Sequence, residues 1–121
     1  MAGKFCVILG VAKDNTDKCT VGFVVANAAA ASDKETMVFL TLEGTRVCQK
    51  GYADDVHEIG FAPLKELIEN FQKAGGKIWV CSPCFKKRDL NEANLLPGAT
   101  MVGGAKLIEF LSDGAASVSF V

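Results

Sequence analysis

The sequence predicts an α/β fold: a three-layer, flavodoxin-like arrangement of a mostly parallel five-stranded sheet in the order 2-1-3-4-5, with helices on both faces. Short apolar runs alternate with segments of helical periodicity, which is the pattern of strand–helix–strand units. Most runs are apolar at successive positions, as expected for strands covered on both faces. The 121 residues are enough for one hydrophobic core, and we expect a single domain over residues 1–121.

The first part of the chain contains one expected strand and one expected helix. The strand is the apolar run Phe5–Leu9, which Gly10 ends. The helix extends from about Asp17 to Ala31, and Asp14 or Thr16 is placed to cap its start. Alanines in the second half of this segment favour helix, and their small side chains allow a neighbour to approach closely.

The middle of the chain contains the second strand and the clearest helix. The strand is expected over Val38–Leu42, and residues 43–62 are irregular because glycines interrupt them. Proline is a favourable first-turn residue, so the helix is expected to begin near Pro63 and to end at Gly75-Gly76. Its apolar side chains recur at helical spacing, at Leu64, Leu67, Ile68 and Phe71.

The last third of the chain supplies the remaining elements. A short helix is expected within Lys86–Asn94. Strands are expected over Ile78–Cys81, Ala99–Val102 and Ser117–Val121, the last at an edge of the sheet because it alternates apolar and polar residues. An amphipathic helix is expected over Gly103–Asp113, with Leu107, Ile108 and Leu111 inward and a stop at Gly114.

Composition and charge limit the classes of function. The net charge of −1 gives no electrostatic basis for nucleic-acid binding. The longest apolar stretch, Val21–Ala31, is too short to cross a bilayer, so no membrane span is expected. The chain has five cysteines and no recognisable export signal, which favours a reducing cytoplasm where thiols stay free.

The most informative motif is Cys81-Ser82-Pro83-Cys84, which directly follows an apolar run. Two thiols three positions apart on one helical turn lie on the same side, close enough to act as a dithiol. Unpaired N–H groups at a helix start, and the basic residues Lys86, Lys87 and Arg88, favour the reactive thiolate form of sulfur. We therefore expect Cys81 to be an exposed, acidified nucleophile at the mouth of a pocket.

Other residues are candidates for the same pocket. In the predicted order, strands 1 and 3 flank the point where the order reverses, and ligands bind beyond the carboxyl ends of such strands. Glu43 and Gly44 follow strand 2 and are expected at the pocket rim. Cys48 either approaches the ligand or fills the core. His57 is either a proton donor or a solvated loop residue.

Metal and nucleotide chemistry find little support in the motifs. A structural zinc site needs four ligands, whereas this chain has one Cys-x-x-Cys pair and one histidine, so no metal is expected. No glycine-rich phosphate-binding loop follows the first strand, and no cofactor is expected. The remaining cysteines, Cys6 and Cys19, are expected in the core.

Six fragments along the chain, taken in order, match a known family. They are Val24–Ala29, Val38–Gly44, Lys50–Asp54, Pro63–Leu67, Val80–Cys84 and Gly103–Ala105. Together they cover almost the whole chain, and it is their order and spacing that make the match specific. The chain resembles the DsrE/DsrF-like proteins, which include sulfur-relay subunits of the DsrE and TusD type and small stand-alone members labelled as predicted peroxiredoxins.

The resemblance implies a flavodoxin-like fold and homo-oligomers, often trimers or hexamers. In the sulfur-relay members, a cysteine at the end of the third strand carries sulfur as a persulfide, and Cys81 matches that position. The stand-alone members also have the second cysteine, which Cys84 matches. Lys87 and Arg88 match a basic pair that commonly follows, and the glycine usual after that arginine is Asp89 here.

Three functions remain open at this point. The first is a cytoplasmic sulfur-transfer protein in which Cys81 holds sulfur as a persulfide and Cys84 releases it. Its partner would be a sulfur donor or acceptor protein, or a small persulfide. The second is a dithiol–disulfide redox protein that uses both thiols without carrying sulfur. The third is a non-enzymatic binding module, and the apolar content favours a homo-oligomer in each case.

Overall fold

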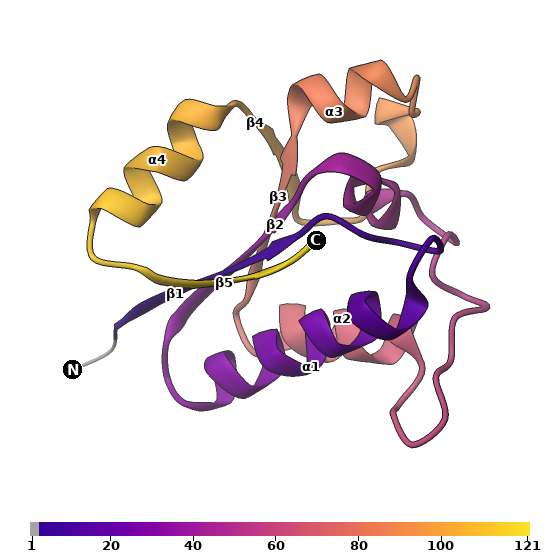
Figure 1. Ribbon diagram of the computed structural model, residues 1–121, viewed down its shortest axis with the longest axis horizontal. Helices are drawn as coiled ribbons and strands as arrows, with labels where there is room; N and C mark the ends of the chain where they lie inside the picture. The colour runs from indigo at the N-terminus through magenta and orange to yellow at the C-terminus, as the bar shows by residue number, and fades with distance from the viewer. Residues whose placement is uncertain (1–2) are drawn as a thin grey trace.

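All neighbouring strands of the sheet are parallel, and helices lie on both of its faces (Figure 1). The computed structural model describes residues 3–121, so Met1 and Ala2 of the expected domain lie outside the described residues. The five strands are β1 (Lys4–Leu9), β2 (Glu35–Leu40), β3 (Lys77–Cys81), β4 (Ala99–Val102) and β5 (Ala116–Phe120). The helices are α1 (Thr16–Ala31), α2 (Leu64–Lys73), α3 (Ser82–Lys87) and α4 (Gly104–Ser112), with short 3-10 helices η1 (Leu42–Cys48) and η2 (Glu92–Asn94). The predicted α/β class with a parallel, five-stranded, flavodoxin-like sheet is confirmed.

The strand order differs from the predicted order 2-1-3-4-5. The observed order is β4-β3-β2-β1-β5, so β2 lies between β1 and β3, and β5 lies at an edge as its alternation predicted. Residues 36–40 of β2 are all buried, and a strand whose side chains are buried in both directions belongs in the middle of a parallel sheet. The prediction that strands 1 and 3 are neighbours was wrong. As a result, the residues after β2 lie beside those after β3.

Two helices cover one face of the sheet, and α4 covers the other (Figure 1). On the first face, Phe23 of α1 and Phe71 of α2 meet edge to face, with ring centroids 6.1 Å apart. On the second face, Phe110 of α4 packs with Met37 and Phe39 of β2. The larger part of the hydrophobic core lies between the sheet and the pair α1 and α2.

The helix boundaries follow local sequence signals. The cap of α1 is Asn15 rather than the expected Asp14 or Thr16, and its side chain accepts a hydrogen bond of 3.0 Å from the Lys18 N–H. The helix α3 begins at residue 82, before the predicted range, whereas η2 falls inside that range. Among the helices of residues 3–121, none combines the length and apolarity that a bilayer span requires.

The inward face of α4 differs at one position from the prediction. Ile108 is 61% exposed, and Phe110 is buried in its place. Leu107 and Leu111 pack against the same cluster as Phe110, as predicted for these two leucines. Positions i, i+3 and i+4 share one face of a helix, and the next residue points about 100° away, which explains why Ile108 faces solvent.

Candidate functional site

The two cysteines of the Cys-x-x-Cys motif lie in contact at the carboxyl edge of the sheet. Cys81 ends β3, and Cys84 lies in the first turn of α3 after Pro83. The Cys81 thiol donates to Cys84 Sγ across 3.3 Å. Both thiols are free and partly exposed. The i, i+3 spacing therefore brings together the two sulfurs that the sequence singled out.

The segment that follows β2 contacts Cys84. The strands β2 and β3 are paired, which carries Thr41 to the start of α3, and the Thr41 hydroxyl lies 3.5 Å from Cys84 Sγ. Leu42 has a φ of +51°, a left-handed conformation that costs a residue with a side chain about 1 kcal/mol. This turn leads the chain directly into η1, which packs against α3.

A carboxylate of η1 holds two arginines beside the motif. Glu43 Oε2 accepts from Arg88 Nε at 2.5 Å, and Glu43 Oε1 accepts from Arg46 Nε at 2.8 Å. Arg88 Nη1 also donates to the backbone carbonyl of Cys84 at 3.1 Å. Hydrogen bonds from Arg88 and then Arg46 hold the pKa of Glu43 below its usual value. Since the Arg88 side chain is only 13% exposed, its charge is fixed close to the thiol pair.

The two thiols differ in pKa, and the difference runs against the prediction for Cys81. Burial is the main cause that raises the pKa of Cys81 above that of an ordinary thiol. Burial acts in the same direction on Cys84, but hydrogen bonds from Thr41, from the Leu42 N–H and from the Cys81 thiol outweigh it. The charge of Arg88 adds to these bonds, so the pKa of Cys84 is lowered. The more acidic sulfur of the pair is therefore Cys84.

The predicted basic cluster divides into a fixed arginine and two exposed lysines. Lys86 and Lys87 are exposed, and neither forms an ion pair with another residue of 3–121. Asp89, at the position where the resemblance implies glycine, has a φ of +51°. Glycine adopts this left-handed region most easily, and aspartate tolerates it better than most residues. The loop after Arg88 therefore has a backbone shape that a glycine at position 89 would also suit.

Gly44 and Cys48 are both buried and pack against other parts of the protein. A Cβ on Gly44 would lie 2.1 Å from the carbonyl oxygen of Leu9, so only glycine lets η1 approach the end of β1. Cys48 is fully buried, and burial raises its pKa to about 11. Gly44 was expected at the pocket rim but is buried, and of the two alternatives for Cys48 its burial agrees with the core filler. Cys6 and Cys19 are buried in the core, as predicted.

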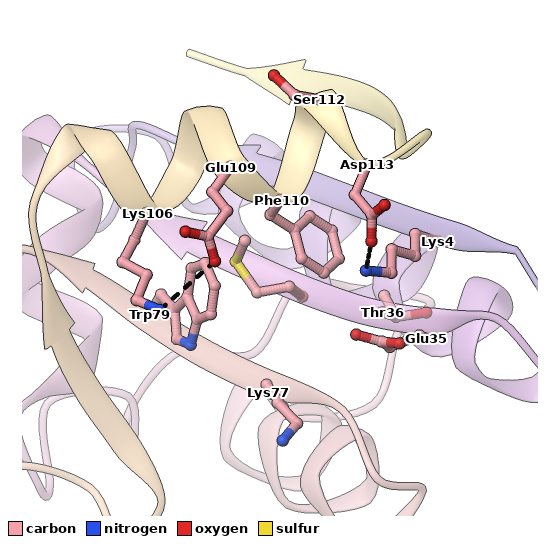
Figure 2. Close-up of a pocket in the computed structure, with 11 residues that line it drawn as sticks. Lys4, Glu35, Thr36, Lys77, Trp79, Lys106, Glu109, Phe110, Ser112 and Asp113 are labelled. Atoms are coloured by element: carbon pink, nitrogen blue, oxygen red, sulfur yellow. Dashed lines mark hydrogen bonds and ion pairs between the residues drawn. The ribbon is translucent and has the colours of Figure 1, made fainter.

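The thiol pair lies outside three cavities that the described residues form. Cavities of about 490, 370 and 330 Å³ are present among the described residues, and neither cysteine of the pair lines any of these three. The first lies between α4 and the strands, toward their amino-terminal ends (Figure 2). Trp79 and Phe110 line it, with ring centroids 5.8 Å apart. The pocket expected at Cys81 is not one of these three cavities.

The structure adds no second reactive group to the thiol pair. His57 is exposed, and its Nε2 lies 2.7 Å from the carbonyl oxygen of Phe61 in the same loop. In the part of the chain that the structure describes, no three His, Cys, Asp or Glu side chains gather as metal ligands. The contacts that sequence reasoning missed are Thr41 and Arg46. Thr41 lay inside the strand expected over Val38–Leu42, and recognising its contact with Cys84 required the correct strand order. Arg46 could have been found from its spacing alone, because it lies three residues after Glu43.

Comparisons with known proteins identify the family of the chain. The family model for the DsrE/DsrF-like family matches residues 3–120. An uncharacterized protein of Methanocaldococcus jannaschii, MJ0760, is 30% identical over 98 residues, which are 81% of this chain and 36% of that protein. A second from the same organism, MJ0989, is 28% identical over 117 residues, covering 97% of this chain and 99% of that protein. The chain thus spans about a third of the first relative and nearly all of the second.

Two solved structures share the fold. The ychN protein from E. coli superimposes with a TM-score of 0.77 at 15% identity, covering 97% of this chain and 99% of that one. A protein of unknown function from Methanobacterium thermoautotrophicum, MTH1491, superimposes with a TM-score of 0.74 at 12% identity, covering 98% and 99%. The match of the family model over nearly every residue, together with this shared fold, places the chain: it belongs to the DsrE/DsrF-like family.

Proposed function

We propose that this protein carries sulfane sulfur on the Cys81–Cys84 pair, as a sulfur-transfer protein of the family's sulfur-relay type. The observation that carries the proposal is the contact of 3.3 Å between two partly exposed thiols at the carboxyl edge of the sheet. Thiolate attack on a sulfur–sulfur bond requires an accessible sulfur of lowered pKa, and the pair contains one.

The chemistry balances without an external oxidant. One thiolate attacks the outer sulfur of a donor persulfide, R–S–SH, and forms a new S–S bond as the donor thiolate R–S⁻ leaves. The protein then holds Cys–S–SH. An acceptor thiolate removes the outer sulfur, or the second cysteine attacks the first and releases hydrogen sulfide with formation of a Cys81–Cys84 disulfide. A dithiol reductant returns this disulfide to the starting thiols.

Mass spectrometry after exposure to glutathione persulfide tests the proposal. The parent protein is expected to gain about 32 mass units, one sulfur atom, on a peptide containing the pair. The matched control is the double variant Cys81→Ser/Cys84→Ser, which keeps the three buried cysteines and is expected to gain nothing. A parent protein that takes up no sulfur, although its thiols are reduced and accessible to a small alkylating reagent, would remove this function.

The second candidate is a dithiol–disulfide redox protein, which the close contact of the two sulfurs also favours. The two functions differ in what one cysteine alone can do. A redox protein needs both thiols, so each single serine variant would be inactive. A sulfur carrier with one remaining reactive cysteine still gains one sulfur atom, which the same mass measurement detects.

The proposed partners are a sulfur donor or acceptor protein, or a small persulfide, in a reducing compartment such as the cytoplasm that keeps thiols free. We also propose a homo-oligomer, with a trimer or hexamer as the family implies. Light scattering is expected to give a mass well above 12.8 kDa, and a monomer at micromolar concentration would contradict this assembly.

A further inference from the structure

We infer that Cys84, and not Cys81, is the sulfur that attacks the donor persulfide, and that Cys81 is the resolving thiol. This assignment rests on the proposed function and gives an order to its two sulfurs. It departs from the family's relay subunits, whose sulfur-carrying cysteine matches Cys81.

The hydrogen bonds of the pair have a direction. The Cys81 thiol donates to Cys84 Sγ across 3.3 Å, which places the proton on Cys81 and leaves Cys84 as the acceptor. The Thr41 hydroxyl lies 3.5 Å from the same Cys84 sulfur and can donate to it as well. Hydrogen bonds to the charged form of a group stabilise that form. Cys84 Sγ therefore accepts from the Cys81 thiol and has the Thr41 hydroxyl beside it. Cys81 also receives hydrogen bonds from the Cys84 N–H and from Thr41, but burial outweighs them and raises the pKa of Cys81.

A fixed positive charge lies on the Cys84 side of the pair. Arg88 Nη1 donates to the backbone carbonyl of Cys84 at 3.1 Å, and Arg88 Nε is held by Glu43 Oε2 at 2.5 Å. With its side chain 13% exposed, Arg88 has little freedom to move into solvent. Thr41, Arg88 and Glu43 are therefore positioning residues: each acts through the charge state of Cys84.

The charged groups around the pair come from two elements. Glu43 and Arg46 belong to η1, and Arg88 directly follows α3. Two cations face one carboxylate in this network. Since Glu43 neutralises one of them, about one positive charge remains to favour an anionic sulfur.

The sequence of steps follows from this assignment. The Cys84 thiolate attacks the outer sulfur of R–S–SH, the donor leaves as R–S⁻, and Cys84 holds the persulfide. Cys81 then attacks the Cys84 sulfur, its proton passes to the departing sulfur, and hydrogen sulfide and the Cys81–Cys84 disulfide form. An acceptor thiolate that arrives first takes the outer sulfur and leaves Cys84 reduced.

Single serine variants distinguish the two cysteines. Each variant protein is mixed with glutathione persulfide at about pH 7, quenched with acid at increasing times and analysed by mass spectrometry. Cys81→Ser is expected to load one sulfur on Cys84 at close to the parental rate, because a serine hydroxyl can still donate, and to retain it for lack of a resolver. Cys84→Ser is expected to load at least about tenfold more slowly. Thr41→Val, which keeps the shape of the side chain, is expected to move the pH midpoint of loading upward.

The outcomes separate the inference from the function on which it rests. Faster loading in Cys84→Ser than in Cys81→Ser, or equal loading in both, would overturn the assignment while the carrier function stands. If no variant and no parent protein loads sulfur, the function fails, and the order is then read from the parent by iodoacetamide and peptide mapping. Alkylation first at Cys84 supports the assignment, and alkylation first at Cys81 overturns it.

Discussion

Gly44→Ala is expected to lower the free energy of unfolding by about 3 kcal/mol or more, and with it the midpoint of thermal unfolding by about 10 °C. The added Cβ would lie 2.1 Å from the carbonyl oxygen of Leu9 and 2.9 Å from its carbonyl carbon. Both atoms belong to backbone, so no side-chain rotation relieves the overlap, and η1 must move away from β1. Chemical denaturation followed by the fluorescence of Trp79, the single tryptophan, measures the change.

The matched control for this substitution is Gly104→Ala. Nothing lies within 4 Å of a Cβ at Gly104, which is the first residue of α4. Alanine favours helix over glycine, so this variant is expected to be as stable as the parent or more stable by about 0.5 kcal/mol. A Gly44→Ala protein that unfolds at the same denaturant concentration as the Gly104→Ala protein would show that η1 does not pack as described.

Displacement of η1 also affects the thiol site. Thr41 and Glu43 lie on either side of Leu42 at the start of η1. The Thr41 hydroxyl contacts Cys84 Sγ, and the Glu43 carboxylate accepts from Arg88. A Gly44→Ala protein that still folds is therefore expected to lose part of the acidity of Cys84. We expect Gly44 to affect the thiol site through the position of η1.

The fold class could be predicted because strands that are buried on both faces appear in the sequence as continuous apolar runs. A strand such as Phe5–Leu9, apolar at every position, has no solvent-facing side, and a parallel sheet between helices is the usual structure that hides it. The strand order was harder to predict from the sequence, because helical crossovers of similar length can place the next strand on either side of the previous one. The continuous apolar run around Val38 did favour a central strand over the edge position that the order 2-1-3-4-5 gave it.

The contact between the two thiols could be predicted because it depends only on local spacing. Their surroundings could not, because they depend on which strands are paired. The spacing of Cys81 and Cys84 alone brings their sulfurs into contact on one helical turn. The contact of Thr41 with Cys84 depends on the pairing of β2 with β3. An incorrect order therefore hid the hydroxyl, and with it the reason that the second cysteine is the more acidic.

Arg88→Gln is expected to raise the pH midpoint of Cys84 alkylation by about one unit and to slow the reaction at pH values below that midpoint by up to about tenfold. The thiolate is the form that reacts, and the Arg88 charge is among the causes that lower the pKa of Cys84. Its removal also frees Glu43, whose negative charge then opposes the thiolate without a partner at Oε2. Both effects raise the pKa of Cys84, so reactivity is lost from the acidic side of the profile first.

Two companion variants show whether charge or geometry is responsible. Arg88→Lys keeps the charge but loses the planar fork that contacts both Glu43 and the Cys84 carbonyl, so an intermediate midpoint is expected. Lys87→Gln removes the same charge from an exposed position, where solvent and salt weaken its field, and a smaller rise is expected. A profile of Arg88→Gln that superimposes on the parent's would mean that hydrogen bonds alone set the acidity of Cys84. An equal rise in Lys87→Gln and Arg88→Gln would mean that the whole basic segment acts, as its sequence first suggested, and that the contact between Arg88 and Glu43 has no special part in it.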